Sequence, residues 1–94
     1  MNFGNALEAL KAGSKVAREG WNGKNMWLIL VDGTRGVQPR EGTPYAKAGI
    51  EVVDINPHID MFTAQGTMQP GWLASQTDML AEDWTVVEAL SAAA

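Results

Sequence analysis

The stretch PGWLASQTDMLAEDW, residues 70–84, combines a turn, two tryptophans and a run of polar side chains that could hold a small ligand. Ser75 and Asp78 have the spacing of a capping box, with Asp in place of the usual Glu or Gln. This spacing predicts a short helix that begins at Gln76, with its backbone N–H groups and positive dipole end facing outward. Such an end beside Trp72 suits a flat anionic ligand such as a nucleotide. The alternative is that Ser75 and Asp78 only cap the helix and the tryptophans only fill the core.

The string GWNGK, residues 20–24, supplies a second group of side chains suited to the same chemistry. Trp21 lies in a turn, and an indole can stack on a purine for about 1–3 kcal/mol per base. Asn22 offers the paired donor and acceptor that a base edge requires. Arg18 and Lys24 flank the turn, and either cation could meet a phosphate, Arg through a planar fork and Lys as a point charge.

The neighbouring polar residues extend this set. Gln76 offers the same amide chemistry as an asparagine, and Asp78 could accept hydrogen bonds from ribose hydroxyls or from a base amine. Thr77 completes the polar run. For each tryptophan the competing interpretation is packing in the core, and Trp84, on an alternating strand, is assigned to the core outright.

Catalysis is a weaker interpretation of this sequence. The chain has no cysteine and a single histidine, His58. Ser75, His58 and Asp78 could be drawn as a triad, but the G-x-S-x-G context of a nucleophilic serine is absent from the sequence. A magnesium site built from Asp54 and Asp60 is conceivable, since magnesium accepts one or two carboxylates plus ligand phosphates. Neither a P-loop nor a G-x-G-x-x-G string occurs, so we expect neither enzymatic activity nor a cofactor or metal.

Composition limits the class of partner. The 94 residues carry a net charge of −4, and residues 51–94 contain seven carboxylates but no Lys or Arg. This acidity argues against long nucleic acid, whose affinity comes from many phosphate contacts, but a basic patch in residues 1–24 still suits one small phosphate ligand. The longest apolar run, residues 26–31, is far too short for a membrane span. No signal peptide is visible, so we expect a cytoplasmic protein.

The periodicity of the apolar residues predicts a small single α+β domain, in which an N-terminal helix packs on a short antiparallel sheet and a second short helix lies near the C-terminus. So small a chain is often helped by oligomerisation. Residues 32–56 are rich in turn residues, and we expect a poorly structured insert there. The predicted elements are a helix over 3–12, strands over 14–18 and 26–31, a hairpin turn at 22–23, a helix over 44–48, a strand over 51–55, a hairpin around 65–66, a strand over 84–88 and a frayed tail over 89–94.

Three strings, MNFGNALEALKAGSKVAREGWNGK, PHIDMFTAQGT and WLASQTDMLAEDW, closely resemble a family of small phage proteins, the second type of Thoeris anti-defence sponge. The resemblance covers residues 1–31 and 57–88 and leaves out the middle segment, 32–56, which we therefore treat as a variable insert. It implies a homotetramer of small α+β chains that acts in the infected bacterium.

Members of that family bind cyclic nucleotide messengers of bacterial immunity, notably glycocyclic ADP-ribose, and some also take cyclic di- or trinucleotides at separate sites. They hold the messenger without destroying it. The resemblance therefore implies a non-catalytic sponge with pockets shared between protomers; an enzyme that cleaves the messenger, or a protein–protein interaction module, remains the alternative. The predicted ligand-binding residues are Arg18, Trp21, Asn22, Lys24, Trp72, Ser75, Gln76, Thr77 and Asp78.

Overall fold

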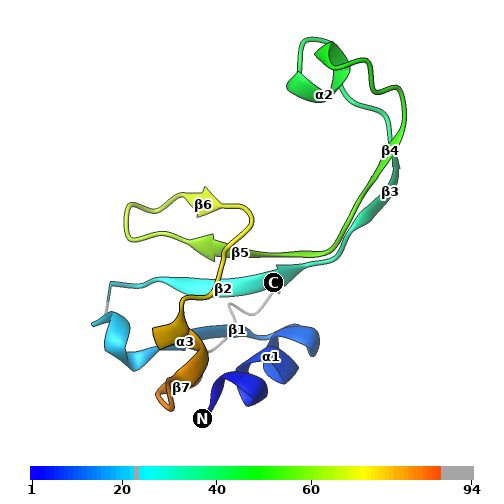
Figure 1. Ribbon diagram of the computed structural model, residues 1–94. Coiled ribbons are helices and arrows are strands. Elements are labelled where there is room, and N and C mark those ends of the chain that lie inside the picture. Colours follow the sequence, from blue (N-terminus) through cyan, green and yellow to red (C-terminus); the bar gives the residue numbers. More distant parts are fainter. Residues whose placement is uncertain (23, 88–94) are drawn as a thin grey trace, which may run out of the picture.

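The computed structural model describes residues 1–22 and 24–87, which form a body and an arm that projects from it (Figure 1). The body contains a five-stranded antiparallel sheet in the order β6-β5-β2-β1-β7, and the arm contains a two-stranded sheet, β3-β4. The strands are β1 (Lys15–Arg18), β2 (Trp27–Val31), β3 (Thr34–Val37), β4 (Val53–Ile55), β5 (His58–Phe62), β6 (Met68–Gln69) and β7 (Trp84–Val87). The helices are α1 (Phe3–Lys11), η1 (Glu19–Trp21, a 3-10 turn), α2 (Pro44–Lys47) and α3 (Gln76–Leu80).

The N-terminal helix α1 forms as its sequence predicts. Asn2 caps it, because the side-chain oxygen of Asn2 accepts a hydrogen bond from the Asn5 N–H at 2.8 Å. Gly13, with φ of 94°, follows the helix in the left-handed conformation typical of a helix end. Ala6 and Leu10 lie on one face of the helix and are buried against the sheet. The predicted α+β arrangement of an N-terminal helix on an antiparallel sheet is confirmed, as is the second helix near the C-terminus.

The core is small and lies between α1 and one face of the sheet. Val16, Leu28 and Trp84 come from three neighbouring strands and are at most 1% exposed. Val16 stands directly opposite Leu28 in the β1–β2 pair, so the two side chains point to the same face. The assignment of Trp84 to the core is confirmed.

The opposite face of the sheet carries a stacked aromatic pair. Trp27 on β2 and Phe62 on β5 are register partners, and their rings are nearly parallel with centroids 4.9 Å apart. The ammonium group of Lys15 lies 4.7 Å from the centroid of the Trp27 ring, which is cation–π geometry. Trp27 is therefore held by neighbours from two other strands.

Residues 32–56 form the arm and are not the poorly structured insert that we expected, since they contain β3, α2 and β4. After a two-residue break, β2 leads into β3, and β4 leads into β5 in the same way, so the arm extends two strands of the body (Figure 1). Asp54 holds the hairpin together, because its carboxylate accepts the Gly36 N–H at 2.9 Å and lies 3.6 Å from the Arg35 guanidinium. The radius of gyration is 15.5 Å, against about 12 Å for a compact chain of this length.

The connection from β1 to β2 also differs from the predicted two-residue hairpin at Asn22 and Gly23. The chain leaves β1 at Arg18, makes the 3-10 turn η1, and enters β2 only at Trp27. Asn22 does adopt the left-handed conformation, with φ of 59°. The backbone of η1 is drawn toward β7 instead of crossing directly to β2, because Asp83 accepts hydrogen bonds from the N–H groups of residues 19 and 20. Gly23 lies outside the described residues, and so does the predicted frayed tail.

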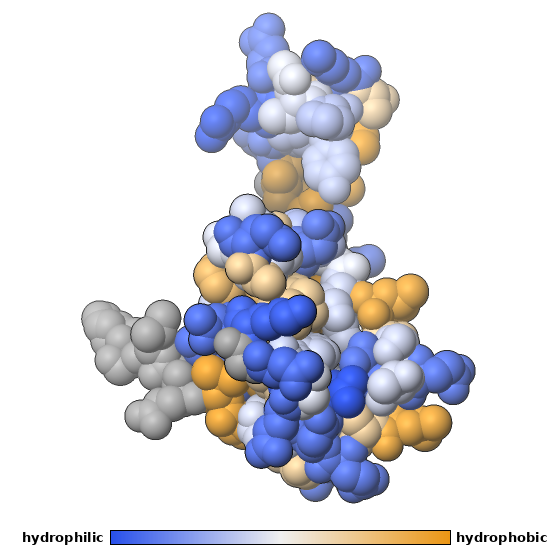
Figure 2. All heavy atoms as spheres, turned by 90° about the vertical axis from the view of Figure 1, so that its left-hand side faces the viewer, coloured by the Kyte–Doolittle hydropathy of each residue, from blue (hydrophilic) through white to orange (hydrophobic). Residues whose placement is uncertain are grey.

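Several large apolar side chains remain on the surface. Figure 2 shows apolar patches on the body and at the base of the arm. Leu73 is 89% exposed and Leu80 is 76% exposed, and both lie in the segment that leads into or through α3.

We predict that Gly33→Ala destabilises the protein by about 1–3 kcal/mol, because a Cβ at this position would overlap the carbonyl oxygen of Ile55 and force a backbone shift. Gly4→Ala is the matched control, since the added methyl group would lie 3.4 Å from the nearest atom, the side-chain oxygen of Asn2, and would favour the helix. Urea unfolding of both variants measures the two effects. Equal stability of Gly33→Ala and the unmodified protein would contradict this close approach of Gly33 to Ile55 at the base of the arm.

Candidate functional site

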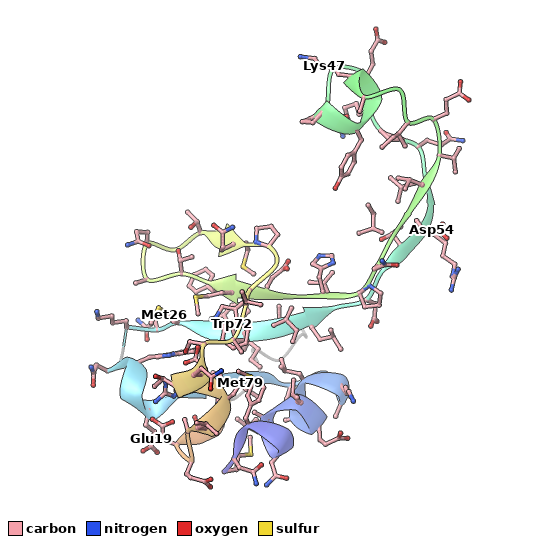
Figure 3. All side chains as sticks on the ribbon, in the orientation of Figure 1. Glu19, Met26, Lys47, Asp54, Trp72 and Met79 are labelled. Carbon is pink, nitrogen blue, oxygen red and sulfur yellow. The ribbon has the colours of Figure 1, made fainter. Side chains whose placement is uncertain are left out.

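Trp84 brings the two predicted ligand-binding segments together. The ring of Trp21, from the GWNGK segment, meets the Trp84 ring edge-on at a centroid distance of 5.4 Å. The Trp72 ring approaches Trp84 at 6.2 Å, also nearly perpendicular, and lies 6.4 Å from Phe3. Trp72 is on the side of the sheet that carries α3 (Figure 3). Trp21 and Trp72 are both partly buried, so each packs on the core and keeps part of its surface accessible.

The capping box at α3 forms as predicted. The Ser75 hydroxyl accepts the Asp78 N–H at 3.0 Å, and the Asp78 carboxylate accepts the Ser75 N–H at 3.1 Å. The Asp78 carbonyl accepts a further hydrogen bond from the indole N–H of Trp84 at 2.9 Å. The cap therefore fixes both the start of α3 and its position over the buried tryptophan.

Arg18 and Asp78, both predicted to meet ligand, contact each other. The Arg18 guanidinium donates to Asp78 at 2.9 Å and to Asp83 at 2.8 and 3.4 Å. The exposed fractions of these three side chains are 14%, 14% and 30%, so the cluster is largely shielded from water. Asp83 also accepts the Gly20 N–H at 2.7 Å.

The pKa values of the three groups follow from this geometry. The hydrogen bonds from Arg18, with that from the Gly20 N–H, hold the pKa of Asp83 below its ordinary value and outweigh the opposing effect of burial. At Asp78, burial alone would raise the pKa, but the hydrogen bonds from Arg18 and Ser75 together lower it. The carboxylates in turn raise the pKa of Arg18. All three groups are charged near neutral pH.

The remaining predicted residues lie on the surface. Asn22 and Lys24 are exposed beside η1, and Ser75, Gln76 and Thr77 are exposed at the start of α3. The structure thus brings the GWNGK segment and the 72–78 segment to one end of the body. Side chains able to stack, to read a base edge and to neutralise a phosphate lie within that end.

The residues considered for catalysis are distributed differently. His58 and Asp60 are neighbours on β5, with 3.6 Å between a ring nitrogen and a carboxylate oxygen, but Asp60 accepts the Gly71 N–H. Asp54 lies in the arm and is paired there with Arg35 (Figure 3). Ser75 is engaged in its cap. Within residues 1–22 and 24–87, no three His, Asp or Glu side chains gather as a metal site would require.

The comparisons with known proteins match nearly the whole chain. A family model described as Tad2-like, the Thoeris anti-defense 2-like domain, matches residues 1–87. The chain belongs to the Thoeris anti-defense 2-like family. It is also similar to a protein named Thoeris anti-defense 2 from Bacillus phage SP01, with 44% identity over 87 residues, which cover 93% of this chain and 94% of that protein. The predicted resemblance is confirmed, and the match to the Tad2-like family model runs through the middle segment, residues 32–56, as well.

Among the described parts of this Tad2-like chain, none of the helices has the length and apolar character that a membrane span requires.

Sequence reasoning missed two features of this Tad2-like domain. In the sequence, Asp83 follows Glu82 and precedes a strand, a place typical of solvated surface, whereas its carboxylate binds both Arg18 and the Gly20 N–H. The one available signal was its place before the buried Trp84, which stands opposite Arg18 in the β1–β7 register. Neighbours across a strand pair are set by register, which the sequence of one strand does not reveal.

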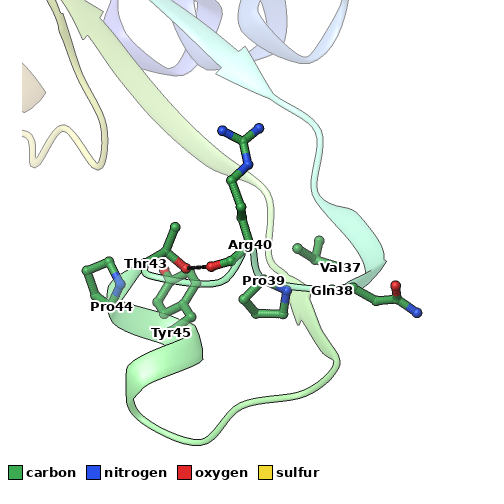
Figure 4. Close-up of a pocket in the computed structure, with 7 residues that line it drawn as sticks. All are labelled: Val37, Gln38, Pro39, Arg40, Thr43, Pro44 and Tyr45. Atoms are coloured by element: carbon green, nitrogen blue, oxygen red, sulfur yellow. Dashed lines mark hydrogen bonds between the residues drawn. The ribbon is translucent and has the colours of Figure 1, made fainter.

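The second missed feature is a hollow at the tip of the arm (Figure 4). Its volume is about 650 Å³, within the usual range of small-molecule sites. The Thr43 hydroxyl donates to the Arg40 carbonyl at 2.6 Å and shapes the loop. The lining residues are Val37, Gln38, Pro39, Arg40, Thr43, Pro44 and Tyr45.

We predict a loss of stability in acid that depends on Asp83. Because the folded-state pKa values of Asp78 and Asp83 lie below the ordinary value of 3.8, their contribution is present at neutral pH and is lost as pH falls from about 5 toward 1. Urea unfolding from pH 7 down through the acid range should show Asp83→Asn less stable than the unmodified protein at pH 7, with the two converging in acid. Glu82→Gln, at the exposed neighbouring carboxylate, is the control. A constant gap between Asp83→Asn and the unmodified protein would exclude the ion pair as its source.

Proposed function

We propose that this chain binds and sequesters cyclic nucleotide messengers of bacterial immunity, glycocyclic ADP-ribose in particular, and releases them chemically unchanged. It thereby counteracts Thoeris signalling in the cytoplasm of the infected cell. Membership of the Thoeris anti-defense 2-like family supports the anti-defence role. The single observation that supports a nucleotide-binding site is that Trp21, from the GWNGK segment, and Trp72, from the 72–78 segment, both pack on Trp84.

The chemistry of that meeting point fits a phosphorylated, purine-containing ring. The partly buried rings of Trp21 and Trp72 offer apolar surface on which a base can stack. Asn22 and Gln76 are exposed amides that can pair with a base edge, and Lys24 supplies a nearby positive charge. A sponge needs tight binding, and a nanomolar Kd corresponds to about −12 kcal/mol. Stacking, charge-assisted hydrogen bonds and a largely preformed site together can reach that value.

We further propose that the chain assembles as a homotetramer whose pockets are shared between protomers. The core of one chain is small, and the apolar side chains of Leu73 and Leu80 are almost fully exposed close to the candidate site. Burial of those side chains by a second copy would close the site from one side and exclude water from it. Exclusion of water strengthens the electrostatic contacts to a ligand.

Two other functions would give different results in one experiment. Glycocyclic ADP-ribose is incubated with the protein, the protein is heat-denatured, and the supernatant is analysed by mass spectrometry. Recovery of intact messenger that was protected from solution before heating supports sequestration. New products would instead indicate an enzyme that uses His58, Asp54 or Asp60. A protein–protein interaction module would give no thermal shift with any messenger and would co-purify with a macromolecule.

We predict that the double variant Asn22→Gly and Gln76→Ala weakens messenger binding by about tenfold or more, since each side chain would contribute about one net hydrogen bond of 0.5–1.5 kcal/mol. Glycine at position 22 keeps the left-handed backbone, where φ is 59°, so the turn is preserved. Calorimetric titration with glycocyclic ADP-ribose measures the effect.

Gln65→Ala is the matched control for that double variant, because Gln65 is exposed in the turn between β5 and β6. The tryptophans are less suitable targets, since Trp→Ala substitution on a core residue costs about 3–5 kcal/mol of stability. Unchanged affinity of the folded double variant would remove these two side chains from the site.

The hollow at the tip of the arm is the place we propose for a cyclic dinucleotide. Tyr45 is 52% exposed there and offers a ring for stacking, and Arg40 offers a guanidinium for phosphate. Tyr45→Ala with Arg40→Gln should weaken binding of a cyclic dinucleotide by about tenfold and leave binding of glycocyclic ADP-ribose within about twofold. Parallel titrations of the two ligands test this, and an equal loss for both would argue against separate sites.

A further inference from the structure

A continuous chain of charge-assisted hydrogen bonds joins the two halves of the proposed site. It starts at the Gly20 N–H, which donates to Asp83, and runs through the Arg18 guanidinium to Asp78. The second oxygen of Asp78 accepts the Ser75 N–H at the start of α3. The turn that carries Trp21 and the helix that carries Gln76 are therefore tied by side chains as well as by packing.

The charges within this cluster make Arg18 a poor phosphate ligand. One guanidinium lies between two carboxylates, so the three groups together carry a net charge of −1. The Nε and both terminal nitrogens of Arg18 already donate to carboxylate oxygens. Three of the five guanidinium N–H donors are used in this way, and a phosphate that approached the other two would meet the negative charge of both carboxylates.

The backbone of the turn lies close to Asp83 at Gly20. A Cβ on Gly20 would lie 2.8 Å from the Asp83 carboxylate and 3.1 Å from the Arg18 guanidinium. Glycine at this position lets the backbone come close enough to donate at 2.7 Å. The Glu19 N–H also donates to the Asp83 carbonyl at 3.1 Å, so two successive residues of η1 are held by one residue.

We propose that Asp83, acting through Arg18, is a positioning residue that fixes the separation between the Trp21–Asn22 turn and the start of α3, and so preforms the ligand site. This inference rests on the proposed function. It assigns Arg18 a role in holding the site and not in contacting phosphate. A preformed site loses less conformational freedom when ligand binds, and its affinity is correspondingly higher.

The direction in which Asp83→Asn changes ligand affinity distinguishes a positioning role of Arg18 from contact with phosphate. The Arg18–Asp78–Asp83 cluster acts as a clamp, and it weakens when Asp83 loses its charge, so binding of glycocyclic ADP-ribose should weaken by about tenfold. If Arg18 instead contacts phosphate, removing the carboxylate frees the guanidinium and binding becomes tighter. Glu82→Gln removes one negative charge from the adjacent residue and should stay within about twofold of the unmodified protein. Tighter or unchanged binding by Asp83→Asn would overturn the proposal.

Arg18→Lys provides a second test that holds even if Asp83→Asn does not fold. Lysine keeps the positive charge but lacks the planar fork that bridges two carboxylates. The positioning role predicts that Arg18→Lys binds about as weakly as Asp83→Asn, with the same dependence of affinity on salt as the unmodified protein. Affinity close to that of the unmodified protein would contradict the clamp.

Near-ultraviolet circular dichroism tests the clamp without any ligand, because it reports the packing of the tryptophan rings. Trp21 and Trp72 each contact Trp84, so a shift of the turn relative to α3 alters the signal of these rings. We expect Asp83→Asn and Arg18→Lys to change this spectrum and Glu82→Gln to leave it unchanged. If the unmodified protein binds neither messenger class, the proposed function fails, and this spectrum alone decides the clamp: an unchanged signal in both variants overturns it.

Discussion

The burial of Trp84 is the constraint on which the rest of the body depends. Its ring is 1% exposed, and its indole N–H donates to the Asp78 carbonyl at 2.9 Å. A buried indole needs such a partner, and this hydrogen bond holds α3 against the sheet. Phe3, Trp21 and Trp72 pack around the same ring. One side chain therefore determines where the first helix, the η1 turn and the α3 segment meet.

The ion pairs of Arg18 add to that packing and restrict how the packed segments are oriented. Aromatic rings can slide over one another at small cost, whereas a guanidinium between two carboxylates accepts only a narrow range of distances and angles. The cluster lies largely out of water, where such contacts are stronger than at an exposed surface. Packing thus sets which segments meet, and the hydrogen-bonded cluster sets their spacing. A binding site that must be ready before its ligand arrives benefits from both.

Local patterns in the sequence predicted the elements whose hydrogen bonds are local. The apolar spacing of Phe3, Leu7 and Leu10 gave α1, and the Ser75–Asp78 pair gave the start of α3. Non-local contacts overrode local signals elsewhere: the Asn-Gly turn was expected to close a tight hairpin, but Asp83, 63 residues after Gly20, holds that backbone. Likewise the partners of Arg18 could not be predicted, because they depend on the β1–β7 register. In the arm, β4 lies within the strand predicted over 51–55 and α2 within the helix predicted over 44–48, whereas β3 was not predicted, because it contains Gly36 and is supported by its pairing with β4.

Residues 32–33 and 56–57 join the arm to the body, and within the arm β3 pairs with β4. A hairpin built in this way can be lengthened or shortened without disturbing the sheet beneath it. Side chains alternate between faces along a strand, so changes of two residues in each strand keep every side chain on its original face, and changes of one reverse them all. Length variation in steps of two would let evolution, or a designer, extend the reach of the tip while the aromatic cluster below stays as it is.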